Sequence, residues 1–318
     1  MSNKAEPLIR SRVSLAPMAG ISDYVLRSLV RKYSTNCLLT TEMISSEYLA
    51  QTLNGRSGIE ILKRDKNHSP ISYQISGHKP DIMHNAAKFL SDYADMIDIN
   101  MGCPVKKVVG GQDGASLMRN QDLAQDIVKA VKDGTNKPVS VKFRLGYTTD
   151  EMNYVEFGQA MQNAGADFIT IHARTRSQMY SGKADWAKIK MLKENIDIPV
   201  FANGDVTSIE DAINCLELSH ADGIAIGRGA IGDPGLIYRI EYYLKTGKIL
   251  PSPSIEEKMS ILKLHLDEEI KLRGQNVGIK FMRKFYSYYL TGFENAKKIR
   301  SKLVIEDNYE NIINILKI

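Results

Sequence analysis

Cysteine, tryptophan and long hydrophobic runs are scarce in this sequence of 318 residues, which contains three cysteines and one tryptophan. Cys37, Cys103 and Cys215 are too few and too scattered for a disulfide framework or a cysteine-based zinc site. No segment approaches the ~18 uninterrupted apolar residues of a membrane span, and no apolar stretch of a signal peptide follows the charged N-terminus. We therefore expect a cytoplasmic protein in a reducing compartment.

Several catalytic signatures are also missing. The sequence has no HExxH, no GxSxG and no phosphate-binding P-loop, and its cysteines and histidines do not cluster as metal ligands. No GxGxxG follows the first β-branched run, so a tightly held nicotinamide domain is not evident. These absences argue against a resident metal, metal-assisted hydrolysis and serine catalysis.

Short β-branched runs alternate with helical patterns over residues 1–247. Their spacing is typical of βα units rather than hairpins, so the strands should be parallel with right-handed crossovers. Eight such units predict an α/β fold, a (β/α)8 TIM barrel. The expected strands are Val13–Pro17, Leu38–Met43, Ile71–Ser76, Met96–Asn100, Val139–Phe143, Phe168–His172, Val200–Asn203 and Gly223–Gly227.

A change of pattern follows the barrel. Residues 248–254 contain two prolines and two serines and predict a linker. Residues 255–318 have helical periodicity throughout and predict a small all-helical domain. Its expected helices are Ile255–Arg273, Gly278–Tyr289, Phe293–Leu303 and Tyr309–Lys317.

Polar side chains lie at or just beyond the C-terminal ends of the expected strands, where barrel enzymes assemble their active sites. One such residue alone is more often a hydrogen-bonding group at a strand end. Seven together favour an active site. They are Glu42, Gln74, Asn100, Lys142, His172, Asn203 and Arg228.

Two glycine turns predict a phosphate site. Gly227-Arg228-Gly229 combines backbone NH groups with a guanidinium, and Asn203-Gly204-Asp205 follows the preceding strand. Barrels often bind phosphate between their seventh and eighth strands, although each motif alone also fits an ordinary turn.

The segment IDINMGCP delivers Asn100 and Cys103 to the same rim. Gly102 permits a sharp turn that would expose the thiol, which could then act as a proton donor or a nucleophile. The alternative is that Cys103 is a small hydrophobic residue.

Lys142 and His172 end adjacent strands and would suit an electron-rich ring such as a flavin, whose reduced form accumulates negative charge. The alternative is a buried lysine paired with Glu42 or Asp98.

Basic residues are concentrated near the C-terminus. Residues 271–302 contain nine lysines and arginines, six aromatic residues and a single acid, Glu294. This composition predicts a surface for a polyanion, and a solvated charged face is the alternative. Our candidate RNA contacts there are Arg283, Lys284, Lys297 and Arg300.

The ordered motifs APMAGISD, IDINMGCPVKK, VKFRLG, IHARTR, NGDV and IGRG resemble those of the tRNA-dihydrouridine synthases, most closely the bacterial B-type branch. This resemblance implies an FMN enzyme that uses NADPH to reduce a uridine of folded RNA, in the D-loop of tRNA, to 5,6-dihydrouridine. Hydride would reach uracil C6 from the flavin, and Cys103 would protonate C5. Two segments depart from the family pattern, GGQDGAS after residue 109 and Arg283-Lys284-Phe285.

The same resemblance implies residue roles. Flavin contacts are expected from Pro17, Met18, Ala19, Gln74, Lys142, His172, Asn203, Gly204, Asp205, Gly227 and Arg228. Asn100, Arg144 and Arg174 are expected to contact the uridine. We expect a monomer when the protein is free of RNA.

Two other functions compete with this one. A flavin barrel of the dihydroorotate dehydrogenase type, acting on a free pyrimidine, would not need the basic tail. An RNA-binding protein that has lost its cofactor would not need the phosphate motifs or Cys103.

Overall fold

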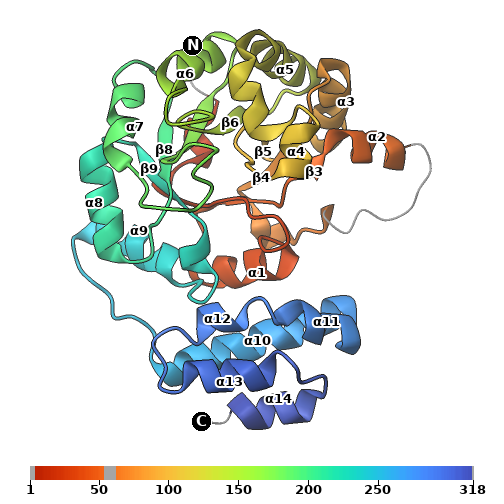
Figure 1. Ribbon diagram of the computed structural model, residues 1–318, viewed down its shortest axis with the longest axis vertical. Helices are drawn as coiled ribbons and strands as arrows, with labels where there is room; N and C mark the ends of the chain where they lie inside the picture. The colour runs from red at the N-terminus through yellow and green to blue at the C-terminus, as the bar shows by residue number, and fades with distance from the viewer. Residues whose placement is uncertain (1–3, 54–61, 317–318) are drawn as a thin grey trace.

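A computed structural model describes residues 4–53 and 62–316 and contains the expected barrel (Figure 1). All strand pairs are parallel, and β2 pairs with both β1 and β4, which closes the barrel. The eight barrel strands are β1 Val13–Leu15, β2 Leu38–Thr40, β4 Ile71–Ser76, β5 Met96–Asn100, β6 Val139–Arg144, β7 Phe168–His172, β8 Val200–Asn203 and β9 Gly223–Ile226. The predicted fold is therefore confirmed.

The expected second strand is broken into two pieces. Thr40 of β2 pairs with Ser72, whereas Ile44 of the short strand β3 Ile44–Ser45 pairs with Ile75. Three residues, 41–43, therefore lie opposite two, 73 and 74, as in a β-bulge. The extra residue changes the direction of the chain at Glu42.

Helices between the strands follow the predicted pattern, with side-chain N-caps such as Asp23, Asn120 and Ser208. Two further helices, α2 Ser46–Leu53 and α4 Lys106–Gly110, were not predicted. The expected helices are α1 Tyr24–Tyr33, α3 Pro80–Leu90, α5 Gln121–Gly134, α6 Tyr154–Asn163, α7 Trp186–Lys193, α8 Ile209–Ser219 and α9 Leu236–Thr246.

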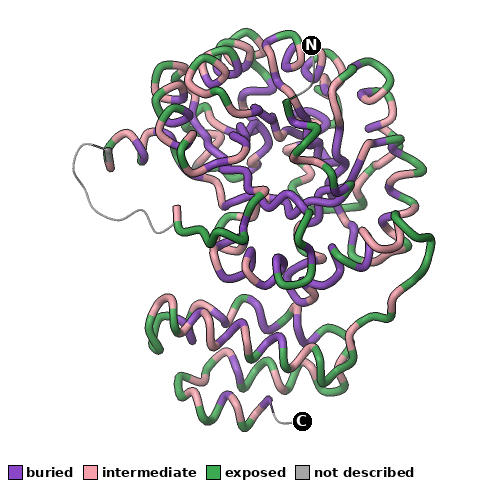
Figure 2. Tube along the Cα trace, turned by 180° about the vertical axis from the view of Figure 1, so that it is seen from behind, coloured by how far each residue is buried: buried purple, intermediate pink, exposed green. Residues whose placement is uncertain are grey.

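The main hydrophobic core lies between the strands and their surrounding helices (Figure 2). Strands β4 and β5 are buried along their whole length, including their polar residues Ser72, Gln74 and Asp98. Ala16, Phe168 and Phe201 belong to a separate cluster, with the rings of Phe168 and Phe201 in edge-to-face contact. This packing fixes β7 and β8 relative to each other at the ends where Phe168 and Phe201 lie.

Residues 255–316 form a second cluster of helices, here called the helical unit, below α1 in Figure 1. It has its own core, which includes Leu262, Phe285 and Tyr289. A capping box between Ser254 and Glu257 begins its first helix. Its members are α10 Ile255–Arg273, α11 Gln275–Met282, α12 Tyr286–Tyr289, α13 Ala296–Leu303 and α14 Tyr309–Leu316. Lys317, where the last helix was expected to end, lies outside the described residues.

One helix prediction was wrong. The single helix expected over Gly278–Tyr289 is divided into α11 and α12 by a turn at residues 283–285. Phe285 and Tyr286 are neighbours in sequence, yet both are fully buried. At the break, the backbone NH groups of Arg283 and Phe285 donate to the carbonyl oxygens three residues back, over 3.4 and 2.9 Å, as in a 3₁₀ turn rather than an α-helix.

Three aromatic residues of the basic tail do not lie on the surface, where residues that contact a polyanion would have to be. Phe285, Tyr286 and Tyr289 are 0% exposed and belong to the core of the helical unit. They are therefore not available to stack on RNA bases. Phe281, Tyr288 and Phe293 are half-buried, so they remain candidates for RNA contacts together with the exposed basic side chains.

In the described part of the chain, no helix is both long and apolar enough to span a bilayer.

Replacing Phe285 by alanine should destabilise the helical unit. The ring is fully buried and lies 4.6 Å from the His265 ring, so its loss leaves a cavity costing about 3 to 5 kcal/mol. Urea denaturation followed by circular dichroism at the helix band should show an earlier transition. Val277→Ala is the control, since Val277 is 57% exposed. Equal midpoints for the two variants would contradict the burial of Phe285.

Candidate active site

The strand register brings the expected rim residues together. Asn100 of β5 pairs with Lys142 of β6, and Arg144 of β6 pairs with His172 of β7. His172 in turn pairs with Asn203 of β8. Residues far apart in sequence therefore form one continuous arc at the carboxyl ends of the strands.

A chain of side-chain hydrogen bonds runs along this arc to the cysteine loop. Ser140 donates to Asp98 over 2.6 Å, and the Gln74 amide donates to the same carboxyl group over 2.6 Å. The Asn100 amide donates to Gln74 Oε1 over 2.8 Å, and Asn100 Oδ1 accepts from the backbone NH of Cys103 over 2.9 Å. The position of Cys103 thus depends on a polar chain that begins inside the barrel.

Burial shapes the charges near this chain. It raises the pKa of Asp98 to about 6, although hydrogen bonds from Ser140 and Gln74 act in the opposite direction. Burial and the nearby Arg144 cation lower the pKa of Lys142 to about 8. Among the described residues, no carboxylate accepts a hydrogen bond from Lys142, because Asp98 is engaged by Ser140 and Gln74. The alternative of a directly paired lysine is therefore not what the structure shows.

The loop that carries Cys103 is held from both sides. Arg144 Nε donates to the carbonyl oxygen of Gly102 over 2.8 Å, and the backbone NH of Ala115 donates to that of Cys103 over 3.1 Å. A Cβ on Gly102 would lie 3.2 Å from the backbone of Phe143, so this close approach requires glycine.

The three cysteines differ in environment as expected. Cys103 is half-buried, whereas Cys37 and Cys215 are 0% exposed. Burial raises the pKa of the Cys37 thiol to about 11 and that of Cys215 to about 12. Cys103 is therefore the thiol available for chemistry.

Arg144 links two loops of the site. Besides Gly102, its guanidinium donates to the carbonyl oxygens of Thr175 and Met179, each over 2.9 Å. Burial lowers its pKa to about 10. The loop after β7 is thereby fixed to the loop after β5, and Tyr180 lies between Arg144 and Arg228, with each guanidinium carbon within 6 Å of the ring centroid.

His172 is a buried neutral imidazole with an unused ring nitrogen. Burial and the surrounding cations, Arg144 and Lys142 foremost, hold its pKa well below the usual range. Its Nδ1 has no hydrogen-bond partner among the described residues. A polar atom in that condition is costly unless a ligand or water satisfies it.

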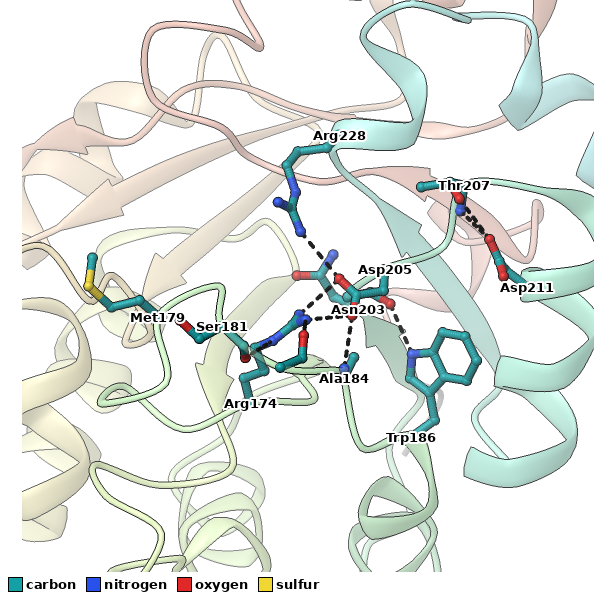
Figure 3. A network of polar contacts seen from close by, with 12 residues as sticks. Arg174, Met179, Ser181, Ala184, Trp186, Asn203, Asp205, Thr207, Asp211 and Arg228 are labelled. Carbon is teal, nitrogen blue, oxygen red and sulfur yellow. Dashed lines mark hydrogen bonds and ion pairs between the residues drawn. The ribbon is translucent and has the colours of Figure 1, made fainter. Parts of the chain in front are cut away.

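Asp205 is the centre of the expected phosphate site (Figure 3). Arg174 binds both of its carboxylate oxygens, over 2.9 and 2.5 Å, and Arg228 lies 3.2 Å from Oδ1. Burial alone would raise the pKa of Asp205, but hydrogen bonds from Arg174 and the Ala184 NH lower it below its usual value. Asp205 therefore stays ionised and orients the Arg228 side chain, which is 46% exposed.

The glycine turns provide close access to the backbone. Gly204 has φ +123°, and a Cβ there would lie 3.0 Å from Ala184 Cβ and 3.4 Å from His172 Nε2. A Cβ on Gly227 would lie 3.4 Å from Met18 Sδ. A ligand that combines a phosphate with a polar ring would fit this site. The site offers a small backbone cradle, an exposed guanidinium and an unsatisfied imidazole nitrogen.

The basic residues of the tail are not part of this arc. Arg283 pairs with Asp307 over 2.8 Å, and Lys297 and Arg300 are exposed on α13. Lys284 is different, because its ammonium donates to the carbonyl oxygen of Gly20 in the barrel. Lys284 thus differs from the other three candidate contacts because it reaches the barrel.

Sequence reasoning missed two site residues. Asp98 was considered only as a partner for lysine, although a carboxylate inside the apolar strand IDIN signals a buried polar network. Tyr180 lies in a loop without regular structure, where no periodic pattern marks it.

Polar and charged side chains gathered at the carboxyl ends of a closed parallel barrel define a TIM-barrel enzyme. The sequence profile described as dihydrouridine synthase (Dus) matches residues 14–315, so the chain belongs to the dihydrouridine synthase family and is an oxidoreductase. It is 40% identical to the probable tRNA-dihydrouridine synthase 1 of Synechocystis sp., over 93% of this chain and 82% of that protein. It is 36% identical to tRNA-dihydrouridine synthase B of Pseudomonas aeruginosa, over 92% of this chain and 87% of that protein.

Solved structures of low sequence identity share the fold. Morphinone reductase in complex with tetrahydroNAD superposes with a TM-score of 0.51 at 12% identity, covering 78% of this chain and 90% of that chain. A variant of the enzyme NCR from Zymomonas mobilis gives 0.50 at 16% identity with the same coverage. Both likenesses support the barrel architecture.

Asp98→Asn should change the pH dependence of stability. The folded-state pKa of Asp98 is raised to about 6, so the folded protein retains a proton that the unfolded chain releases near its ordinary value of 3.8. As the pH rises from about 4 to 6, the free energy of unfolding of the natural protein should therefore fall by up to about 3 kcal/mol relative to that of the variant. Urea unfolding at pH 4, 5, 6 and 7 measures this, and a difference independent of pH would contradict it.

Proposed function

We propose that this protein binds FMN and uses NADPH to reduce a specific uridine of folded RNA, in the D-loop of tRNA, to 5,6-dihydrouridine. The observation that carries the proposal is the hydrogen-bonded chain that fixes the Cys103 loop beside Lys142 and His172. Membership of the dihydrouridine synthase family supports it.

The flavin would be held by two groups of residues. We assign its ring to a wall of Pro17, Met18 and Ala19 and to the polar groups of Gln74, Lys142 and His172. We assign its phosphate chain to Asn203, Gly204, Asp205, Gly227 and Arg228. When bound, the flavin supplies the hydride that adds to C6 of the uracil. The free Lys142 ammonium suits the negative charge that a flavin ring carries when reduced.

Cys103 would donate a proton from its thiol to C5 of the uracil. The cationic side chains of Lys142 and Arg144 both lie near the Cys103 thiol. Asn100 and Arg144 hold the loop on which the thiol lies. We propose that these two residues shape the uridine pocket, and that Arg174 acts by orienting Asp205.

The RNA would extend from this pocket onto the helical unit. We propose that residues 1–247 are the catalytic domain, that 248–254 are a linker, and that 255–318 form the RNA-binding domain. Lys297 and Arg300 are exposed on α13 and form no ion pair with any described residue, so they are free to meet phosphates. Reaching a stacked uridine requires extruding the base, at a few kcal/mol, and a held RNA lowers the entropic part of that cost.

Cys103→Ala should separate the two halves of the reaction. The variant should retain its flavin and oxidise NADPH, because only the donor of the C5 proton is removed. Dihydrouridine formation should fall by about 10²- to 10⁴-fold, the usual size of general acid catalysis. Flavin absorbance, NADPH consumption and mass spectrometry of the RNA measure the three quantities. Cys215→Ala is the matched control, since its thiol is buried far from the rim. Product formation near the natural rate would remove Cys103 from the mechanism.

Neutralising the exposed tail should weaken RNA binding without affecting the barrel. Lys297→Gln with Arg300→Gln should raise the Kd for tRNA and flatten the dependence of log Kd on log salt by about 0.7 to 0.9 per lost phosphate contact. A salt titration measures the slope. The matched control is Lys88→Gln with Lys129→Gln, which removes the same charge from exposed positions on α3 and α5. Equal slopes for both double variants would show that α13 does not hold the RNA.

A further inference from the structure

We propose that Lys284 is a positioning residue of the flavin site, acting through the peptide group of Gly20, and that it is not an RNA phosphate contact. The inference deepens the proposed function and rests on it. It follows from the direction of the Lys284 side chain, which reaches from the helical unit to the first loop of the barrel.

The target of Lys284 is the tight turn that follows β1. The carbonyl oxygen of Met18 accepts from the backbone NH groups of Ile21 and Ser22, over 3.0 and 2.9 Å. The Met18 NH donates to Ser22 Oγ over 2.9 Å, and Gly20 has φ +71°. This turn carries Met18 and Ala19, to which we assign the flavin wall.

Two opposite charges hold the turn at Gly20. The carboxylate of Glu42 accepts from the Gly20 NH, and the ammonium of Lys284 donates to the Gly20 carbonyl oxygen. Glu42 reaches this point because the bulge between β2 and β3 re-aims the chain. Burial raises the pKa of Glu42 and lowers that of Lys284, so both groups are partly removed from water.

Aromatic packing keeps Lys284 directed at the barrel. Its ammonium lies 3.3 Å from the centroid of the Phe281 ring, and the guanidinium carbon of Arg273 lies 3.9 Å from the same centroid. Arg273 also binds Asp23, the N-cap of α1, over 2.7 Å. Lys284 keeps part of its surface exposed, but its ammonium is directed at the Phe281 ring and the Gly20 carbonyl oxygen.

The turn connects this interface to the phosphate site. Met18 packs against both the barrel core and the core of the helical unit. On its other side, Met18 Sδ lies 3.4 Å from the position of a Cβ on Gly227. A shift of the Gly20 peptide therefore displaces Met18 relative to the turn to which we assign the flavin phosphate.

The test compares Lys284→Met, which keeps the apolar stem but removes the donor, with Lys297→Met on α13. For Lys284→Met we expect an altered visible circular dichroism spectrum of the bound flavin. We also expect kcat for dihydrouridine formation to fall by about tenfold or more, as misplacement of reacting groups does. KM for tRNA and the salt slope of tRNA binding should stay as in the natural protein.

Lys297→Met should show the reverse pattern. Its flavin spectrum should be unchanged, and its salt slope should flatten by about 0.7 to 0.9. Lys284→Arg, which keeps a charged donor, should restore much of the natural spectrum and kcat. If Lys284→Met does not fold, Lys284→Leu provides the same comparison with another apolar side chain that has no donor.

A double-mutant cycle with Glu42→Leu tests whether the two charges act on the same turn. Once Lys284 is replaced, removing Glu42 should change flavin affinity less than it does in the natural protein, because the turn is already released. Additive effects, or a Lys284→Met variant that changes only the salt slope, would overturn the assignment. A natural protein that binds no flavin or makes no dihydrouridine would instead overturn the proposed function.

Discussion

The hydrogen-bond chain from Asp98 through Gln74 to Asn100 is the constraint on which the rest of the site depends. Gln74 is the joint of this chain, because its amide donates to Asp98 while its carbonyl oxygen accepts from Asn100. Its orientation is therefore set on both sides. Since Asn100 also receives the Cys103 NH, the barrel interior determines where the thiol lies. A cysteine on a loop is in this way positioned by strands, which are more rigid than loops.

Electrostatics divide the rim into two regions with different tasks. Around Lys142, Arg144 and His172 the cations lack ion-pair partners among the described residues, and burial keeps His172 neutral. Such a region favours negative charge that develops during a reaction. Around Asp205, by contrast, one carboxylate is bound by Arg174 and touched by Arg228. That pairing orders an exposed guanidinium in advance, which lowers the entropic cost of binding an anion.

The sequence was sufficient for the barrel because parallel strands repeat at βα spacing and are buried on both faces. It was also sufficient to place Asn100, Lys142, His172 and Asn203 on one rim, since strand ends in a barrel share an edge. The sequence did not predict the break between β2 and β3, because β2 is buried at every position and shows no alternation whose phase a one-residue bulge would shift. The role of the aromatics near Phe285 was also hidden, because composition does not distinguish a stacking surface from a small core.

The same distinction matters for the basic tail. A run of lysines and arginines looks uniform in sequence, yet the structure directs its members in different ways. Arg273 and Lys284 point at the first loop of the barrel, where Asp23 and the Gly20 carbonyl oxygen receive them. Lys297 and Arg300 point to solvent. One segment can thus hold the helical unit against the barrel with some of its charged side chains, while its other charged side chains can bind a polyanion. Under the proposed function, RNA bound on α13 would be connected to the barrel rim through the contacts of Arg273 and Lys284.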